Sequence, residues 1–180
     1  KAYAINNEGT TYGTIQTFTT ATTIPSVITS AATTITATTT TLQGDVTADG
    51  GTTITERGFV YAVTNSNNNP TIGAATVTKQ TVSGTTGAFN FGASNLASNT
   101  QYSYKAYATN NQGTTYGSVQ TFTTTITTPS VTTSTATTIM STTTTLHGNV
   151  TTDGGAAITE RGFVYAITLN NNNPLIGGAS

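Results

Sequence analysis

The chain contains one histidine, His147, whose imidazole would be the natural general base of an active site. The sequence repeats itself, and the position equivalent to His147 in the other copy is Gln43. Glutamine cannot take up and return a proton at neutral pH, so a catalytic base should not alternate with it. Serine and threonine are abundant, but no set of His and Asp partners accompanies them within one repeat. The sequence therefore predicts no enzyme, no catalytic residue and no cofactor.

Oxygen ligands for a cation are also sparse. The side chains that could contribute to a Ca²⁺ site between domains are Asp45, Asp49, Asn149 and Asp153. Calcium takes six to eight oxygen ligands, usually with several carboxylates, and each repeat offers few of them. Asp49 and Asp153 each precede two glycines, which is typical of a tight turn. The chain has no cysteine for a thiolate site, so we expect no metal site.

Two charged pairs stand inside strand-like segments, Glu56–Arg57 and Glu160–Arg161. In a chain so poor in charge, one hypothesis is that they form an inter-domain or inter-subunit salt bridge. The alternative is that they are solvated, because neighbouring strand residues face opposite sides of a sheet.

Lys105 raises a third possibility, an intramolecular Lys–Asn isopeptide bond. Such a bond requires a buried lysine beside an acidic group. Lys105 falls on the face opposite Tyr102 and Tyr104 in the predicted strand, so we expect it to point outward. The sequence therefore favours an ordinary surface lysine.

The composition narrows the class of protein. Of 180 residues, 34% are hydrophobic and only 6% are charged, with a net charge of −1, which leaves no basic surface for nucleic acid. About 50 residues are threonine, a β-branched residue that suits a pleated sheet. No apolar run approaches the ~20 residues of a membrane-spanning helix, so we expect no membrane insertion. The absence of cysteine suits a bacterial surface better than a disulfide-stapled secreted domain.

The strongest signal is internal repetition. Lys1–Thr20 and Lys105–Thr124 are nearly identical, which sets a repeat of about 104 residues. Over the overlap 54 of 76 positions agree, and this length is that of an independent sandwich domain. We therefore divide the chain into residues 1–23, the last strands of one repeat; 24–127, a complete repeat; and 128–180, the first half of the next.

We expect each of the two flanking segments to be part of a complete sandwich. A sandwich cut halfway exposes strand edges and apolar side chains, which act as templates for pairing. We expect the sequence to be a window on a longer chain, or neighbouring molecules to complete one another in a head-to-tail fibre.

Alternating residues and turn signals predict seven short strands in residues 24–127. The predicted strands cover 25–28, 38–47, 54–63, 75–82, 87–91, 101–109 and 117–124. Between them, residues 65–70 read as a polar loop and residues 49–51 as a turn. Seven antiparallel strands at this spacing favour a β-sandwich. The expected core and corner residues are Leu42, Phe59, Leu96, Tyr102, Tyr104 and Phe122.

The segment from Leu96 to Tyr102 resembles the leucine-to-tyrosine corner of fibronectin type III domains. The following YSYKAYATNNQG and TFTT resemble the strand F, FG turn and strand G of that family. With Arg57–Tyr61, the repeat is similar to threonine-rich fibronectin type III-like repeats of large secreted surface proteins and adhesins from Bacteroidota-type bacteria. The tryptophan usual in strand B is absent, and there is no Arg-Gly-Asp, so the resemblance does not imply integrin binding.

The resemblance and the repetition lead to three functional hypotheses. The first is a structural repeat of an extracellular surface fibre or adhesin stalk, whose partners are other copies of the repeat. The second is a multivalent adhesive module that binds surface carbohydrate or protein through loops such as Asn65–Pro70 and Asn170–Pro174, gaining avidity from repetition. The third is a spacer in a larger secreted enzyme. Near-identity of the copies favours the first.

Overall fold

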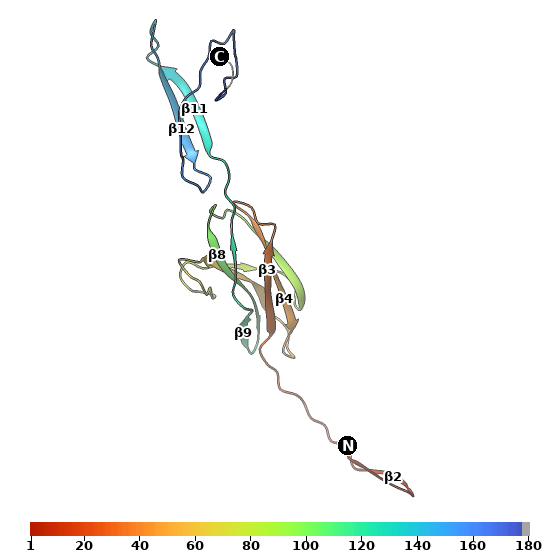
Figure 1. Ribbon diagram of the computed structural model, residues 1–180. Helices are drawn as coiled ribbons and strands as arrows, with labels where there is room; N and C mark the ends of the chain where they lie inside the picture. The colour runs from red at the N-terminus through yellow and green to blue at the C-terminus, as the bar shows by residue number, and fades with distance from the viewer. Residues whose placement is uncertain (178–180) are drawn as a thin grey trace.

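The computed structural model describes residues 1–177, and all its regular elements are β-strands (Figure 1). Threonine, valine and tyrosine favour this backbone because branched and aromatic side chains pack well on a pleated surface. The predicted all-β fold class is confirmed. The twelve strands of the described residues are β1 (Tyr3–Asn6), β2 (Gly9–Tyr12), β3 (Ser26–Thr33), β4 (Thr40–Ala48), β5 (Glu56–Val63), β6 (Thr78–Thr81), β7 (Gly87–Ala93), β8 (Gln101–Asn110), β9 (Gly113–Tyr116), β10 (Gln120–Thr123), β11 (Ser130–Thr137) and β12 (Thr145–Thr152).

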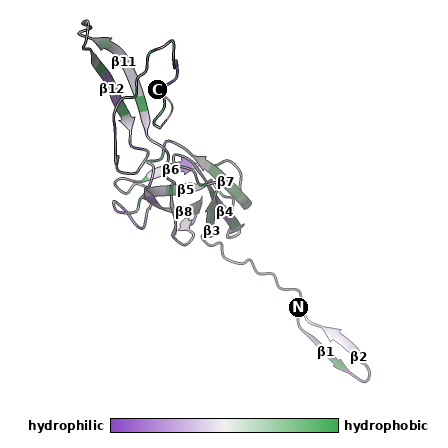
Figure 2. Cartoon of the chain, turned by 45° about the horizontal axis from the view of Figure 1, so that its top comes forward, coloured by the Kyte–Doolittle hydropathy of each residue, from purple (hydrophilic) through white to green (hydrophobic). Residues whose placement is uncertain are grey.

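Strands β3 to β10 form two antiparallel sheets. The first sheet has the order β3-β4-β7, and the second has the order β10-β8-β5-β6, with β9 also paired to β8. Figure 2 shows these strands gathered into the central body of the molecule. Three strands thus face five, with β9 and β10 paired to successive stretches of β8. The first, second and fifth strands of the repeat share one sheet, which is the arrangement of a fibronectin type III-like sandwich.

The core lies between the two sheets. Phe59 of β5 meets Phe89 of β7 across the gap, with ring centroids 4.9 Å apart. Tyr102 of β8 stacks on Phe122 of β10 at 5.4 Å. The six residues expected in the core or corner are all buried in the structure: Leu42, Phe59, Leu96, Tyr102, Tyr104 and Phe122.

Of the last predicted strand, 117–124, only residues 120–123 form a strand, β10; β9 precedes it as an additional strand, and residues 117–119 make a break between the two. At the break the Ala106 amide, which faces this strand, donates a hydrogen bond to Thr29 Oγ1 of β3 at 3.0 Å instead. A side chain at position 117 would collide with Thr29, so glycine is required there. The first strand of the sandwich thus reaches over to the second sheet, and eight strands replace the expected seven.

The flanking strands repeat the pairing of the sandwich. Tyr3 pairs with Tyr12 and Asn6 with Gly9 in β1–β2, as Tyr107 pairs with Tyr116 and Asn110 with Gly113 in β8–β9. The β11–β12 pair matches β3–β4 in the same way, including both register shifts. The β1–β2 hairpin stands away from the sandwich on an extended segment (Figure 1).

The apolar faces of the flanking segments are open in the described structure. Phe18 is 91% exposed and Tyr165 is 81% exposed, whereas their equivalents Phe122 and Tyr61 are 5% and 9% exposed. The domain boundaries given above stay a prediction, and the last three residues of the 128–180 segment lie outside the described residues.

Candidate functional site

Five ionisable side chains of the sandwich gather on the second sheet, on the face turned away from the core. We call Glu56, Lys79, Lys105, Tyr107 and Tyr116 the outer-face cluster. They come from β5, β6, β8 and β9, and the strand register places them on one side because their positions alternate with core residues. Charged and aromatic residues on one face are the arrangement most able to bind a ligand, so this cluster is the candidate site.

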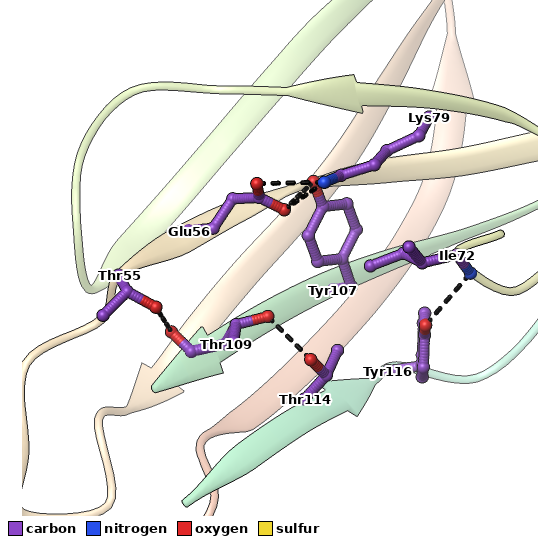
Figure 3. A network of polar contacts seen from close by, with 8 residues as sticks. All are labelled: Thr55, Glu56, Ile72, Lys79, Tyr107, Thr109, Thr114 and Tyr116. Carbon is purple, nitrogen blue, oxygen red and sulfur yellow. Dashed lines mark hydrogen bonds and ion pairs between the residues drawn. The ribbon is translucent and has the colours of Figure 1, made fainter. Parts of the chain in front are cut away.

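Glu56 is the centre of the acidic end of the cluster (Figure 3). Lys79 Nζ lies 2.7 Å from Glu56 Oε1, and the Tyr107 hydroxyl donates to the same oxygen at 2.8 Å. The hydrogen bond from Lys79 lowers the pKa of Glu56, and burial of the phenol, followed by the bond to Glu56, raises the pKa of Tyr107. The carboxylate is therefore held ionised and already has two donors.

Lys105 occupies the other end of the cluster and is only 6% exposed, so the expectation that it points outward into solvent was wrong. Its side chain does leave the core, but a loop covers it. Nζ donates to Asn69 Oδ1 at 2.9 Å and lies 4.5 Å from the centroid of the Tyr116 ring. Burial lowers the pKa of Lys105. The carboxylate on this face, Glu56, is engaged by Lys79 and Tyr107, so the geometry is that of a hydrogen bond and a cation–π contact.

The covering loop, residues 64–77, connects β5 to β6. Tyr116 Oη accepts a hydrogen bond from the Ile72 amide at 3.1 Å (Figure 3), and Pro70 is fully buried against the sheet. The Thr64 and Ser103 hydroxyls bond to one another at 3.0 Å. The polar loop proposed for adhesion is thus pinned to the sheet, and the side chains it exposes are Asn65, Ser66, Asn68 and Asn69.

Arg57 has its partners inside the same sandwich. It is 8% exposed, and its guanidinium donates to the carbonyl oxygens of Ser83, Thr85, Thr86 and Gly87 at 2.7–3.2 Å. Its Cζ also lies 4.7 Å from the Phe89 ring centroid. The carbonyls belong to the segment that carries the chain from β6 in one sheet to β7 in the other. Arg57 therefore fixes that crossing, and an inter-domain or inter-subunit role for Glu56 and Arg57 stays a prediction.

Glu160 and Arg161 are exposed in the second copy. With Val150, Ile158 and Thr159 they line an open depression of about 370 Å³. The equivalents of these residues in the complete sandwich include Val46, Ile54 and Arg57, which are all buried. The depression therefore corresponds to core space of a sandwich, not to a ligand site, and a contact role for Glu160 and Arg161 also stays a prediction.

The corner predicted from sequence has a complete hydrogen-bond set. Tyr102 Oη accepts from the Ala97 amide at 2.9 Å, and Leu96 is buried beneath the turn. Thr124 Oγ1 donates to Ala97 O at 2.6 Å and accepts from the Thr100 amide at 2.9 Å. Tyr104 belongs to the same core face, and its hydroxyl donates to Ser30 O at 2.6 Å. These groups therefore stabilise the folded sandwich.

The remaining chemistry-bearing side chains have local partners. His147 Nε2 lies 2.7 Å from Thr137 Oγ1, and Gln43 Nε2 donates to the equivalent Thr33 Oγ1 at 3.1 Å. Histidine and glutamine thus make the same contact between neighbouring strands. Among residues 1–177, no three His, Asp or Glu side chains gather as a metal site would need.

The aspartates of the two glycine turns also bind locally. Asp49 Oδ1 accepts from the Gly51 amide at 2.8 Å, and Asp153 Oδ1 accepts from the Gly155 amide at 2.8 Å. This is the turn geometry expected of Asp before Gly. In the part of the chain that the structure describes, no helix has the length and apolarity to cross a membrane.

No protein-family model matches this chain, and no curated protein matches it. Among solved structures, it is similar to the sensor domain of the anti-sigma factor RsgI4 in Pseudobacteroides cellulosolvens, with 20% identity over 58% of this chain and 98% of that one, at a TM-score of 0.44. It is similar to the third fibronectin III domain of human KIAA0343 protein, with 12% identity over 63% and 94% of the two chains, at a TM-score of 0.41. The assignment to a fibronectin type III-like sandwich rests on the strand order and register.

Proposed function

We propose that this chain is a structural repeat of an extracellular bacterial surface fibre or adhesin stalk, in which sandwiches follow one another head to tail. The observation that carries the proposal is the recurrence of the same strand register about 104 residues apart: β1–β2 repeats β8–β9, and β11–β12 repeats β3–β4. A chain that repeats one self-contained fold gains length with each copy. Its partners are other copies of the repeat.

The outer-face cluster supports the same function. Its charges are satisfied within the sandwich: Glu56 by Lys79 and Tyr107, Lys105 by Asn69 and the Tyr116 ring. A binding site would present polar groups aimed at an incoming ligand. Here the polar groups instead fasten a loop and the strands beneath it, which is what a module selected for strength requires.

The proposal is tested on the cells that make the protein. Antibodies against residues 24–127 should label intact, unpermeabilised cells in immunogold electron microscopy, with label spaced at regular intervals along filaments. Label confined to permeabilised cells would contradict the extracellular assignment. Label spread evenly over the surface, together with carbohydrate binding that is lost when Asn65 and Asn68 are changed to Ala, would favour the adhesive module instead.

A further inference from the structure

The corner segment of the complete sandwich, residues 97–100, presents Asn99 on a rigid support. Besides the hydrogen bonds of this segment with Thr124 and Tyr102, Thr100 Oγ1 donates to Ser98 O at 2.8 Å. Asn99 has φ of +49°, a backbone conformation that asparagine tolerates better than most residues. Its side chain is exposed at the end of the sandwich that faces the following repeat.

The turn Asp153–Gly155, which follows β12, lies against this end of the sandwich. Asn99 Nδ2 donates to Gly155 O at 2.8 Å. A Cβ placed on Gly155 would lie 2.7 Å from Ser98 Oγ and 2.9 Å from Asn99 Cβ, so the glycine backbone packs directly against these two side chains. Two segments 56 residues apart are thus in direct contact across the boundary between repeats.

The linker between β10 and β11, residues 124–129, leaves the two repeats little freedom to move relative to each other. The Thr125 amide donates to Thr36 O at 3.0 Å on the sandwich side, and the Thr127 amide donates to Gly154 O at 2.9 Å on the side of the next repeat. Only Ile126, which is 58% exposed, lies between these two attachments. A single free residue offers far less flexibility than a linker of several residues.

We propose that the contact of the corner segment 97–100 with the turn 153–155 is a joint that fixes the orientation of each sandwich relative to the next. Asn99 supplies the hydrogen bond, Gly155 permits the close approach, and the doubly anchored linker sets the separation. The partner that this end of the sandwich fits is therefore the glycine turn of the following repeat.

The complete sandwich carries both halves of the joint. At its other end, Gly51 follows Asp49 and Gly50 in the same turn, with the Thr23 amide donating to Gly50 O at 2.9 Å. A joint between unlike surfaces repeats one rotation at every step and builds an open filament of constant twist. The inference deepens the proposed stalk function and depends on it only for this consequence.

Distances between spin labels test the joint in the whole chain. The sequence has no cysteine, so Asn90→Cys in β7 and Thr151→Cys in β12, both at exposed positions, create one labelled pair across the boundary. The parent chain should give one narrow distance distribution in double electron–electron resonance. Asn99→Ala and Gly155→Ala should each broaden it, the first by removing the hydrogen bond and the second by forcing the surfaces apart.

Gly51→Ala is the matched control. Gly51 has φ of +79°, close to the +89° of Gly155, so alanine is equally strained at both positions, but the nearest atom to an added Cβ at Gly51 is Thr22 Cγ2 at 3.7 Å. This variant should keep the narrow distribution. A second pair, Thr133→Cys with Thr151→Cys, reports whether β11–β12 stays formed and should not change in Asn99→Ala.

A broad distribution across the boundary in the parent chain would overturn the joint. So would distributions that stay unchanged in both Asn99→Ala and Gly155→Ala. Neither result would contradict the proposed stalk function, which the cell-surface experiment tests separately, since a flexible chain of sandwiches can still be a surface stalk.

Discussion

The side chain of Tyr102 connects its own strand, β8, to β10 and to the corner segment 97–100. Its ring stacks on Phe122, and its hydroxyl accepts the Ala97 amide of the corner. Tyr102→Ala should lower the free energy of unfolding by about 3 kcal/mol or more, because it leaves a cavity and removes the hydrogen bond that holds the corner. Tyr102→Phe should cost about 1 kcal/mol, the value of the hydrogen bond. Urea unfolding checks both, and an unchanged midpoint in Tyr102→Ala would refute the corner's role.

Arg57 is buried among backbone carbonyls, and no other side-chain type can donate to four of them at once. Arg57→Lys should destabilise the sandwich by about 2 kcal/mol, since several buried carbonyls lose a charged donor. The matched control is Arg161→Lys in the second copy, which is exposed and should change stability little. Equal thermal shifts in the two variants would argue against the internal role of Arg57.

Tyr104 should make the protein sensitive to alkali. Burial raises its pKa from 10.0 to about 12. The unfolded chain ionises this phenol at lower pH than the folded chain does, so its contribution to stability is complete below about pH 10 and is lost as pH rises toward about 12.

Tyr104→Phe removes that ionisation. Stability should therefore fall less steeply over the same pH range, although the variant starts about 1 kcal/mol lower at neutral pH because the bond to Ser30 O is gone. Urea unfolding at a series of pH values gives the slope. A slope equal to that of the parent chain would exclude Tyr104 as the titrating group.

The turn between β3 and β4 contains a strained residue. Thr34 has φ of +51°, and its equivalent in the second copy, Thr138, has φ of +50°. A β-branched side chain is disfavoured in this left-handed region, where asparagine is better tolerated. Thr34→Asn should raise the free energy of unfolding by up to about 1 kcal/mol. Thr41→Asn, within β4, should lower it, and a loss of stability in both variants would contradict the argument.

The strands were predictable from sequence because alternation and turn residues carry that information. Leu42, Phe59 and Tyr102 fall on the buried face by their period of two. What alternation does not show is whether the second face of a strand is also covered. β8 is buried on both faces, so alternation predicts a surface position for Lys105 although a loop lies over it.

The burial of Arg57 and the break at Gly117 were missed for a related reason. Both depend on segments distant in sequence, the β6–β7 crossing and β3 respectively. A polar residue that pairs with backbone carbonyls has no sequence signature, because every residue offers a carbonyl. The available signal was the glycine at position 117, the first residue of the predicted strand 117–124, because a glycine in a strand often marks a bulge or a close approach.

The complete sandwich should fold without its neighbours. Its buried hydrophobic cluster runs from Leu42 to Phe122 and draws on no residue of the flanking segments. A fragment of residues 24–127 should therefore unfold cooperatively in a thermal melt followed by circular dichroism. Residues 128–177 alone, with Phe163 50% exposed, should show no such transition. Loss of the cooperative transition in the 24–127 fragment would show that the boundaries are wrong.

The matching registers of β1–β2 and β8–β9 create competition while the protein is being made, because equivalent strands of adjacent copies can exchange places. Synthesis at ~5–20 residues/s delivers a repeat of about 104 residues in roughly 5–20 s. An all-β sandwich typically folds in milliseconds to seconds. Each copy can thus fold before the equivalent strands of the next copy have been synthesised. A denatured chain of several copies instead refolds with all equivalent strands present, and it should form misfolded species in which strands of adjacent copies are exchanged.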